Sequence, residues 1–408
     1  MKILKVNRVE QHIIKKLHPS WKLIDDLCFK SKNLYNYANY IICQEFINNG
    51  KWIQYNELFQ LCKDSEPYKE IGSNVGQQTL KILDKSWKSF FVAIKDWKKY
   101  PDKYLGRPKL PKYKDKTKGR NILGIDNIKF SIKDGYLRFS WSKLKPLNNI
   151  FKTNAYGKLM QVRFIPKRSH YVLEIVYEID VPDVNLQQNR IIGIDLGINN
   201  FATVSNNSGL MPFIINGKTI KSMNQYYNKK KAEFQSDLKK KHNKDWSNRL
   251  QQLTNKRNNK INDYLHKTSK YVVDWCIANQ IDTVIIGKNK NWKQESKMSK
   301  SVNQNFVGIP YDLFIQKLKY KCENVGIKLI ETEESYTSGT SFLDRELPTK
   351  ENYNKLRRVY RGLFKSNGKT LINADLNGAY QIIKKVIPNA FAEGIEGVGL
   401  HPVRLNVI

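Results

Sequence analysis

Two aspartates stand at positions where a folded chain can use a carboxylate for chemistry. Asp195 ends the apolar run "IIGID" and precedes Gly197, and Asp375 follows a short apolar segment in "LINADLNGAYQIIKK". Either residue can also have a purely local role, because an aspartate caps turns and helix N-termini through its side chain. One such residue alone would favour the local role, so the charge of the whole chain becomes decisive.

The chain is strongly basic. Its 408 residues include 71 Lys and Arg against 37 Asp and Glu, a formal net charge of +34. Such an excess repels itself unless a polyanion neutralises it, and nucleic acid is the expected polyanion. An anionic membrane is the weaker alternative, because no long apolar segment and no basic amphipathic anchor stands out.

Carboxylates that face a polyanion need a reason, and divalent cations are the usual one. Two Mg²⁺ (or Mn²⁺) ions about 3.5–4 Å apart can activate water and stabilise the leaving oxygen in phosphodiester hydrolysis. The two separated acids therefore predict metal-dependent chemistry on nucleic acid.

The first half of the chain reads as helices followed by short strands. Residues 20–100 are helical, and the stripe from Leu80 to Trp97 in "QQTLKILDKSWKSFFVAIKDWKKYP" indicates a buried helix face. Residues 103–120 hold three prolines, which exclude a helix and leave either a solvated linker or a strap on a nucleic-acid backbone. Alternating strands around an Asp-Gly turn at Asp134–Gly135 predict a small β-barrel over 121–181. The candidate contacts to phosphate in this half are Lys85, Lys88, Arg107, Lys109, Lys112, Lys114 and Arg120.

From residue 191 the pattern changes to an α/β layer. "IIGIDL", "FATVS", "PFIIN", "IDTVIIGKN" and "GIKLIETEE" are predicted strands, and "FIQKLKYKCENVG" is a predicted crossover helix. Strands separated by helices favour parallel pairing, and ligands collect at the carboxyl ends of such strands, where Asp195 lies. A lysine-rich, mostly helical stretch covers about 218–280.

The cysteines and the N-terminus indicate a reduced compartment. Five scattered cysteines form no CxxC pair, so neither a disulfide framework nor a zinc knuckle is expected. The first 20 residues have no signal-peptide core. We expect a cytoplasmic, nucleoid-associated protein.

Several stretches resemble the TnpB family, the RNA-guided nucleases of bacterial and archaeal insertion sequences. "GIDLGINNFATVS" and "NADLNGAYQIIKK" are similar to the first and third RuvC motifs, and "LYNYANYI", "LHKTSKYVVDWC" and "GIKLIETEESYTS" agree. The resemblance implies a wedge-like β-barrel domain over 1–18 and 101–190 and a helical recognition lobe over 19–100. It also implies an RNase H-like RuvC nuclease domain over 191–408.

One departure from the family touches the metal site. The family usually carries a glutamate at the end of the fourth RuvC strand, where "TVIIGKNKNW" has Gly287 and Lys288. Taken plainly, this predicts a broken site, as in nuclease-dead TnpB-like repressors. The next strand should lie about 4.8 Å away and ends in Glu333 and Glu334. We favour Glu334 as the relocated ligand, with Gly287 leaving room for it and Glu333 as its substitute; the alternative is that both are solvated.

The other departure is the missing zinc finger. "GTSFLDRELPTKENYNKLRRVYRGLFKSNGK" has no cysteine, so we expect an insertion without zinc at about 337–370, with a hairpin turning at Asn367–Gly368. Three arginines of this insertion are candidates for the guide–target duplex, with solvated surface as the alternative: Arg357, Arg358 and Arg361.

The resemblance therefore predicts an RNA-guided, Mg²⁺- or Mn²⁺-dependent DNA endonuclease that cuts beside a short flanking motif. Asp195 would bridge two metals, with Glu334 and Asp375 each completing one. The expected partners are target DNA and a guide RNA from the transposon end, with a monomer or a dimer on one RNA. A repressor that binds without cutting is the main alternative. A five-residue likeness of "GIDLG" to the phosphate loop of actin-like ATPases is weak, because no further glycine-rich loop follows.

Overall fold

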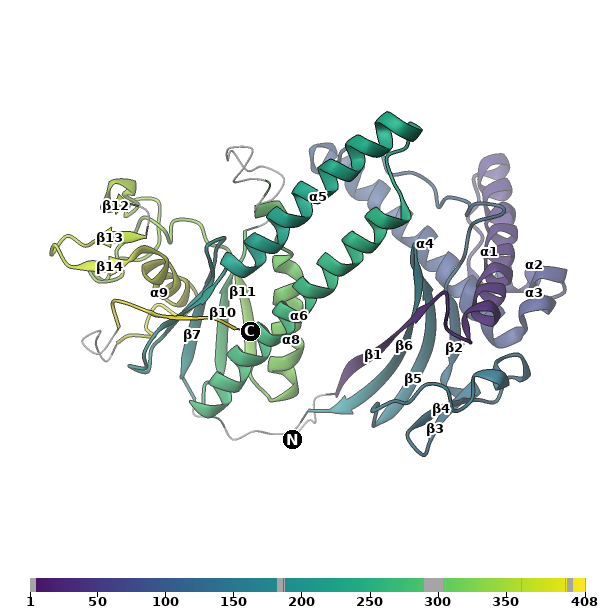
Figure 1. The fold of residues 1–408 in the computed structure, drawn as a ribbon, viewed down its shortest axis with the longest axis horizontal. Helices are drawn as coiled ribbons and strands as arrows, with labels where there is room; N and C mark the ends of the chain where they lie inside the picture. The colour runs from purple at the N-terminus through teal and green to yellow at the C-terminus, as the bar shows by residue number, and fades with distance from the viewer. Residues whose placement is uncertain are drawn as a thin grey trace. The chain divides into compact units, whose positions relative to one another are not determined.

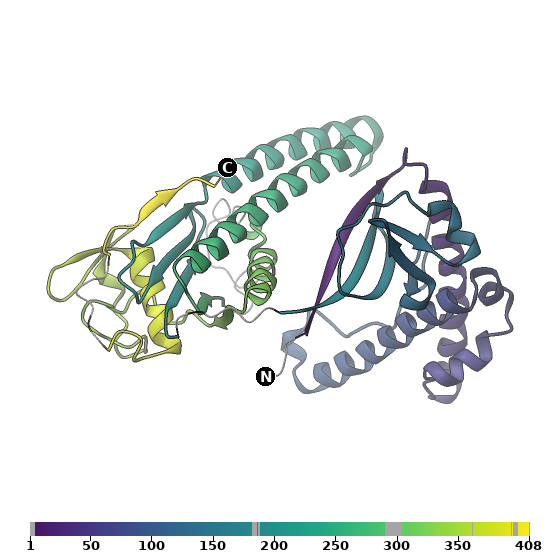
Figure 2. The same ribbon diagram turned by 90° about the horizontal axis from the view of Figure 1, so that it is seen from below.

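The protein is described by a computed structural model. It divides into two compact units, Met1–Asp180 and Val181–Ile408. The fold is of the mixed α/β type, and Figures 1 and 2 show its ribbon in two views. The structure describes residues 5–181, 186, 188–289, 304, 306–360, 362–392, 394 and 399–407.

The first unit is built on a four-stranded antiparallel sheet in the order β1-β6-β5-β2. β1 and β6 pair along eleven residues each. A separate hairpin of β3 and β4 closes at Asp134 and Gly135, whose φ angles of 55° and 73° are those a tight Asp-Gly turn requires. That turn was predicted. The strands are β1 (Lys5–Lys15), β2 (Leu123–Asp126), β3 (Phe130–Lys133), β4 (Tyr136–Phe139), β5 (Lys158–Pro166) and β6 (His170–Asp180).

Helices make up the rest of this unit. The predicted stripe of α4 faces the core: Leu80, Leu83 and Trp87 are fully buried, and Trp87 Nε1 donates to Asn39 Oδ1 of α1 at 2.9 Å. The helix ends at Lys99, before Pro101, because proline cannot continue it. The helices are α1 (Trp21–Asn49), α2 (Tyr55–Cys62), α3 (Glu66–Ile71) and α4 (Ser73–Lys99), with 3₁₀ turns η1 (Pro101–Lys103), η2 (Asn127–Lys129) and η3 (Ser142–Leu147).

The second unit contains a six-stranded sheet in the order β11-β10-β7-β8-β9-β15. β7, β10 and β11 run parallel, as predicted, whereas β7, β8 and β9 form an antiparallel meander. The sequence predicted five of these strands and missed β15, a three-residue strand that pairs parallel to β9. The strands are β7 (Ile191–Leu196), β8 (Asn200–Asn206), β9 (Phe213–Asn216), β10 (Thr283–Gly287), β11 (Lys328–Thr332) and β15 (Val403–Leu405).

Helices cover both faces of this sheet, which explains its unbroken apolar strands. Ile192 and Ile286 face α6 and α8, whereas Ile191 and Ile285 pack against α9. α5 and α6 lie side by side as a helical hairpin (Figure 1). The helices are α5 (Lys218–His242), α6 (Asn248–Ala278), α8 (Tyr311–Asn324) and α9 (Ala374–Val386).

A small antiparallel sheet lies in the stretch before α9. It comprises β12 (Arg358–Tyr360), β13 (Leu363–Lys365) and β14 (Leu371–Asn373), with η4 (Lys355–Arg357) before it. The predicted hairpin is present as β13 and β14, and Asn367 and Gly368 lie in its turn. No helix among the described residues is both long and apolar enough to cross a membrane.

Candidate active site

Three acidic residues reach one edge of the six-stranded sheet from three elements. Asp195 is the fifth residue of β7, Glu334 lies two residues beyond β11, and Asp375 lies in the first turn of α9. β10 pairs with both β7 and β11 in parallel, so these strands end at the same edge.

The structure brings these acids together. Burial, followed by the negative charges of Glu334 and Asp375, raises the pKa of Asp195 well above its usual range. α9 comes close to β7 because Gly378 has no side chain; a Cβ there would stand 3.2 Å from Asp195 Oδ2. Three carboxylates in one neighbourhood repel each other unless cations or protons compensate them.

Gly287 makes the approach of Glu334 possible. Gly287 is the last residue of β10 and pairs with Thr332 of β11. A Cβ built on Gly287 would overlap the carboxylate of Glu334, so the glutamate side chain fills the space that any other residue at 287 would need. This is the arrangement that the relocation hypothesis requires.

Asn289 holds Glu334 in place. Its Oδ1 accepts from the Glu334 backbone N–H at 2.9 Å, and its Nδ2 donates to Glu334 Oε2 at 3.3 Å. The other oxygen, Oε1, is buried with no hydrogen-bond partner. Burial raises the pKa of Glu334 to about 7, against the opposing charge of Lys385. Glu333, the substitute, is exposed, and its carboxylate accepts from Ser335 Oγ.

Asp375 is not the cap of α9. That role belongs to Asn373, whose Oδ1 accepts from the backbone N–H groups of Asp375 and Leu376 at 3.1 and 3.0 Å. The Asp375 carboxylate is free for other partners, and Asn200 Nδ2 of β8 donates to its Oδ2 at 2.6 Å. Asn200 Oδ1 is buried without a partner.

Two cations lie beside the acids. Arg358 Nη2 is 3.5 Å from Asp375 Oδ1, and its charge counteracts the rise in the pKa of Asp195. Lys385 Nζ donates to Ser335 O at 2.9 Å, next to Glu334. Arg358 was predicted to contact a nucleic-acid duplex, and the structure places it against an acid of the site. Lys385, Asn200 and Asn289 were not singled out from the sequence.

The other two arginines of this unit that were predicted to contact nucleic acid are Arg357 and Arg361. Arg357 is largely buried and forms an ion pair with Glu346 at 2.5 Å, which gives it a structural partner. Arg361 lies outside the described residues.

The stretch 103–120 is not a free linker, because α1 holds its backbone. Asn39 Nδ2 donates to Pro111 O at 3.1 Å, and Lys32 Nζ donates to Lys116 O at 2.7 Å. Between them, Asn36 donates to Lys114 O at 2.8 Å and accepts from Lys114 N at 2.9 Å. Positions 32, 36 and 39 share one helix face. We call residues 107–120 the strap.

The residues of the first unit that were predicted to contact phosphate differ in their exposure. Exposed are Lys85, Lys88, Arg107, Lys109 and Lys112, of which Lys88 pairs with Asp84 at 2.7 Å. Lys114 lies over the Tyr35 ring, and burial lowers its pKa. Arg120 donates to both Asp25 oxygens, at 2.9 and 2.7 Å, so its guanidinium ties the strap to α1.

The acids suit a hard divalent cation. Carboxylate oxygens are the ligands that Mg²⁺ and Mn²⁺ prefer, and Glu334 Oε1 is an unpaired acceptor buried at the site. Among the described residues no three Asp, Glu, His or Cys side chains are already drawn around one point as a finished metal site. The chemistry of the donor set fits such a cation.

Two family models match parts of the second half of the chain. A model described as "Probable transposase" (OrfB_IS605) matches residues 174–293, and a "Cas12f1-like, TNB domain" model matches residues 311–382. The first match contains Asp195 and the second contains Glu334 and Asp375. The site is that of an α/β protein with acids from two strand ends and from the first turn of a helix. These two matches support a TnpB-family protein.

The solved structures that match this chain are distant in sequence. A Cas12f1–sgRNA–target DNA complex is 17% identical, covering 92% of this chain and 98% of that one, with a TM-score of 0.37. The mini-RNA-guided endonuclease CRISPR-Cas_phi3 is 9% identical, covering 98% and 94%, with a TM-score of 0.48. CasPhi-2 (Cas12j) bound to crRNA is 9% identical, covering 97% and 99%, with a TM-score of 0.41. A search of curated proteins finds no match.

Proposed function

We propose that this TnpB-family chain is an RNA-guided, metal-dependent endonuclease that cuts DNA beside a short flanking motif. One observation carries the proposal: Asp195, Glu334 and Asp375 meet at one sheet edge, and Gly287 leaves the space that Glu334 fills. The six-stranded sheet with its helices would be the RuvC domain, of RNase H type.

In this proposal the residues divide the work. Asp195, Glu334 and Asp375 would together hold the divalent cations. When bound, the cations would activate water and stabilise the leaving oxygen in an in-line displacement. Asn289 and Asn200 orient two of the carboxylates through hydrogen bonds. Arg358 and Lys385 offset the negative charge of the site.

The remaining chain would bind nucleic acid. Pairing between guide RNA and DNA would read sequence, and the protein would inspect only the flanking duplex. We assign that inspection to the domain over 1–18 and 101–190, as a wedge-type barrel, and to a recognition lobe over 19–100. Lys85 and the strap cations Arg107, Lys109 and Lys112 are exposed and suit phosphate contacts.

Cleavage by matched variants tests the proposal. The protein is purified with co-expressed transposon-end RNA and incubated with matched duplex and Mg²⁺ or Mn²⁺. Glu334→Gln and Asp195→Asn should each lower cleavage by more than about 100-fold, beyond the roughly 10–100-fold of an outer partner, and leave the gel shift of the duplex intact. Glu333→Gln, the neighbouring control, should cut normally.

The same assay also tests the alternative function, RNA-guided DNA binding without cleavage. If the wild-type complex shifts its target but leaves it intact with either cation, the chain is an RNA-guided DNA-binding protein without nuclease activity. If Glu333→Gln abolishes cutting and Glu334→Gln does not, the assignment of the relocated ligand is wrong.

A further inference from the structure

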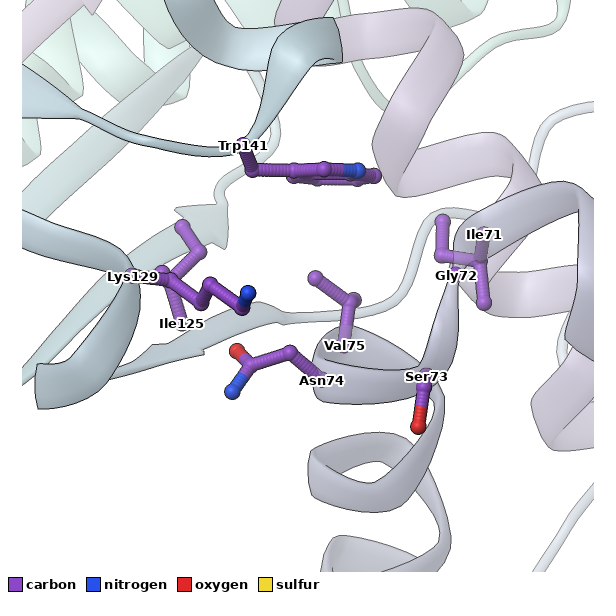
Figure 3. A pocket seen from close by; sticks show the side chains of 8 residues that line it. All are labelled: Ile71, Gly72, Ser73, Asn74, Val75, Ile125, Lys129 and Trp141. Carbon is purple, nitrogen blue, oxygen red and sulfur yellow. The ribbon is translucent and has the colours of Figure 1, made fainter.

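A cavity of about 170 Å³ opens in the first unit, away from the acids (Figure 3). It lies between the first turn of α4 and the residues that precede η3. Trp141, the residue immediately before η3, forms one wall, and Val75 and Asn74 of α4 lie across from its ring (Figure 3). Ile125 of β2 and Lys129 of η2 line another side.

The size and the walls suit one flat ring. A cavity of about 150 Å³ with apolar walls holds a benzene molecule, so this cavity has room for a single six-membered ring rather than a fused pair. Val75 and Ile125 are buried and supply apolar surface. Trp141 is only partly buried, and no other aromatic ring among the described residues is stacked on its indole.

Two polar side chains, Asn74 and Lys129, lie at the cavity and would orient a bound ring. The Oδ1 of Asn74 accepts from the Asp126 backbone N–H at 3.1 Å, which fixes the side-chain amide. In Figure 3 this oxygen lies on the side of the amide that faces Trp141, where it can accept a second hydrogen bond. The ammonium of Lys129 points into the cavity beside Asn74 (Figure 3), and no ion pair of Lys129 occurs among the described residues.

We propose that this cavity binds the base of an unstacked pyrimidine nucleotide in a nucleic-acid strand. The ring would stack on Trp141, Asn74 Oδ1 would accept from an N–H group of the base, and Lys129 would hold the adjacent phosphate. Stacking of a base on an aromatic side chain is a common means of holding single-stranded nucleic acid. This binding site goes beyond the proposed cleavage and does not depend on the carboxylates.

Fluorine NMR on the full-length protein tests the site directly. The chain has 8 tryptophans; with 5-fluorotryptophan incorporated, the signal that disappears in Trp141→Phe belongs to Trp141. Uridine 5′-monophosphate should shift that signal saturably and leave the other tryptophan signals in place. Adenosine 5′-monophosphate should bind more weakly, because its fused ring exceeds the cavity.

Two comparisons separate base from phosphate. Inorganic phosphate alone should not shift the Trp141 signal. Lys129→Gln should raise the Kd for uridine 5′-monophosphate by about 3–10-fold without changing that for uridine, whereas Lys133→Gln, an exposed lysine on β3 with the same charge change, should alter neither. Deoxyuridine 5′-monophosphate shows whether the site prefers RNA or DNA, and binding of either sugar supports it.

The proposal fails if millimolar uridine 5′-monophosphate leaves the Trp141 signal unmoved, or if inorganic phosphate reproduces the shift. It also fails if adenosine 5′-monophosphate binds more tightly than the pyrimidine nucleotide. None of these measurements needs guide RNA or cleavage, so failure here leaves the proposed nuclease untouched.

Discussion

At the scale of single residues, Gly287 and Glu334 form a matched pair across two neighbouring strands. The glutamate occupies the space beside the glycine, and its Oε1 remains an unpaired acceptor in a buried position. A side chain at 287 and the carboxylate of Glu334 therefore cannot both occupy their present space. This mutual exclusion makes the two positions testable together.

We predict that Gly287→Ala lowers cleavage by about 10–100-fold, the range for losing a group that orients a metal ligand, because the methyl group displaces the Glu334 carboxylate. Its cost in stability should stay within about 1–3 kcal/mol. Single-turnover cleavage and urea denaturation measure the two effects. Gly368→Ala is the control, because a Cβ there would meet only Ser366 Oγ, at 3.8 Å. Equal activity of both variants would contradict the prediction.

The reverse exchange is a second test. The double variant Gly287→Glu/Glu334→Ala moves the carboxylate back to the fourth RuvC strand. It should cleave at least about tenfold faster than Glu334→Ala alone, which corresponds to a coupling free energy near 1.4 kcal/mol. Cleavage rates of the double variant and both single variants complete the cycle. A double variant as inactive as Glu334→Ala would show that position 287 cannot replace position 334.

The site should also destabilise the metal-free protein at high pH. Burial raises the pKa of Glu334 from 4.5 to about 7, so the folded state keeps a proton that the unfolded chain has lost. The associated stability is present below about pH 4.5 and is lost as the pH rises through about 7. In EDTA, Glu334→Gln should be more stable than wild type by about 1–3 kcal/mol at about pH 8, with little difference near pH 4.5.

Denaturation curves at the two pH values check this, and Mg²⁺ supplies the control. Divalent cation should stabilise the wild type at about pH 8 and have a smaller effect on the variant. If the two proteins differ equally at both pH values, the effect is one of packing and not of charge.

Much of the acidic cluster was foreseeable from sequence, since Asp195, Glu334 and Asp375 stand where strands and a helix meet. Their partners were not. Asn200 reaches Asp375 across 175 positions of sequence, and Asn289 reaches Glu334 across 45. Such contacts depend on strand register and side-chain direction, which local patterns do not specify.

At the scale of elements, α1 and the strap act as one structure. Asn36 forms two hydrogen bonds with the backbone of Lys114, in the manner of a neighbouring strand. We predict that Asn36→Ala destabilises the protein by about 1–2 kcal/mol and opens the strap lysines to trypsin. Asn33→Ala, on the same helix, should do neither. Urea denaturation and limited proteolysis measure both effects, and a resistant Asn36→Ala strap would show that other contacts hold it.

The elements were predicted well where a pattern is local. The α4 stripe, the Asp-Gly turn and the turn at Asn367–Gly368 follow from spacing and turn chemistry within a few residues. The strap's docking was not predictable, because "KYLGRPKLPKYK" is equally suited to a free linker. Its partner residues on α1 lie 72–84 positions away. The pairing of Arg120 with Asp25 was unpredictable for the same reason, since Asp25 lies 95 positions away.

At the scale of the whole molecule, the charge of +34 should dominate affinity for RNA. The logarithm of the binding constant should fall linearly with the logarithm of salt concentration. Lys109→Gln and Lys112→Gln should each reduce that slope by about 1, because both side chains are exposed. Filter binding over a salt series measures the slopes.

Arg120→Gln serves as the comparison for the two lysine variants in the salt series. Its guanidinium is occupied by Asp25, so the variant should lose stability and keep the wild-type slope. A slope change as large as that of Lys112→Gln would place Arg120 on the nucleic acid.

The parallel pairing of β10 with β11 has a consequence for reading genomes. Because the two strands end side by side, a side chain at position 287 and one at position 334 can reach nearly the same place, although the positions are 47 residues apart in the sequence. A sequence search that scores each alignment column separately would classify such a chain as catalytically inactive, because position 287 has no carboxylate. Scoring the columns of positions 287 and 334 jointly, as a requirement for one carboxylate at either, would separate inactive from active relatives more accurately.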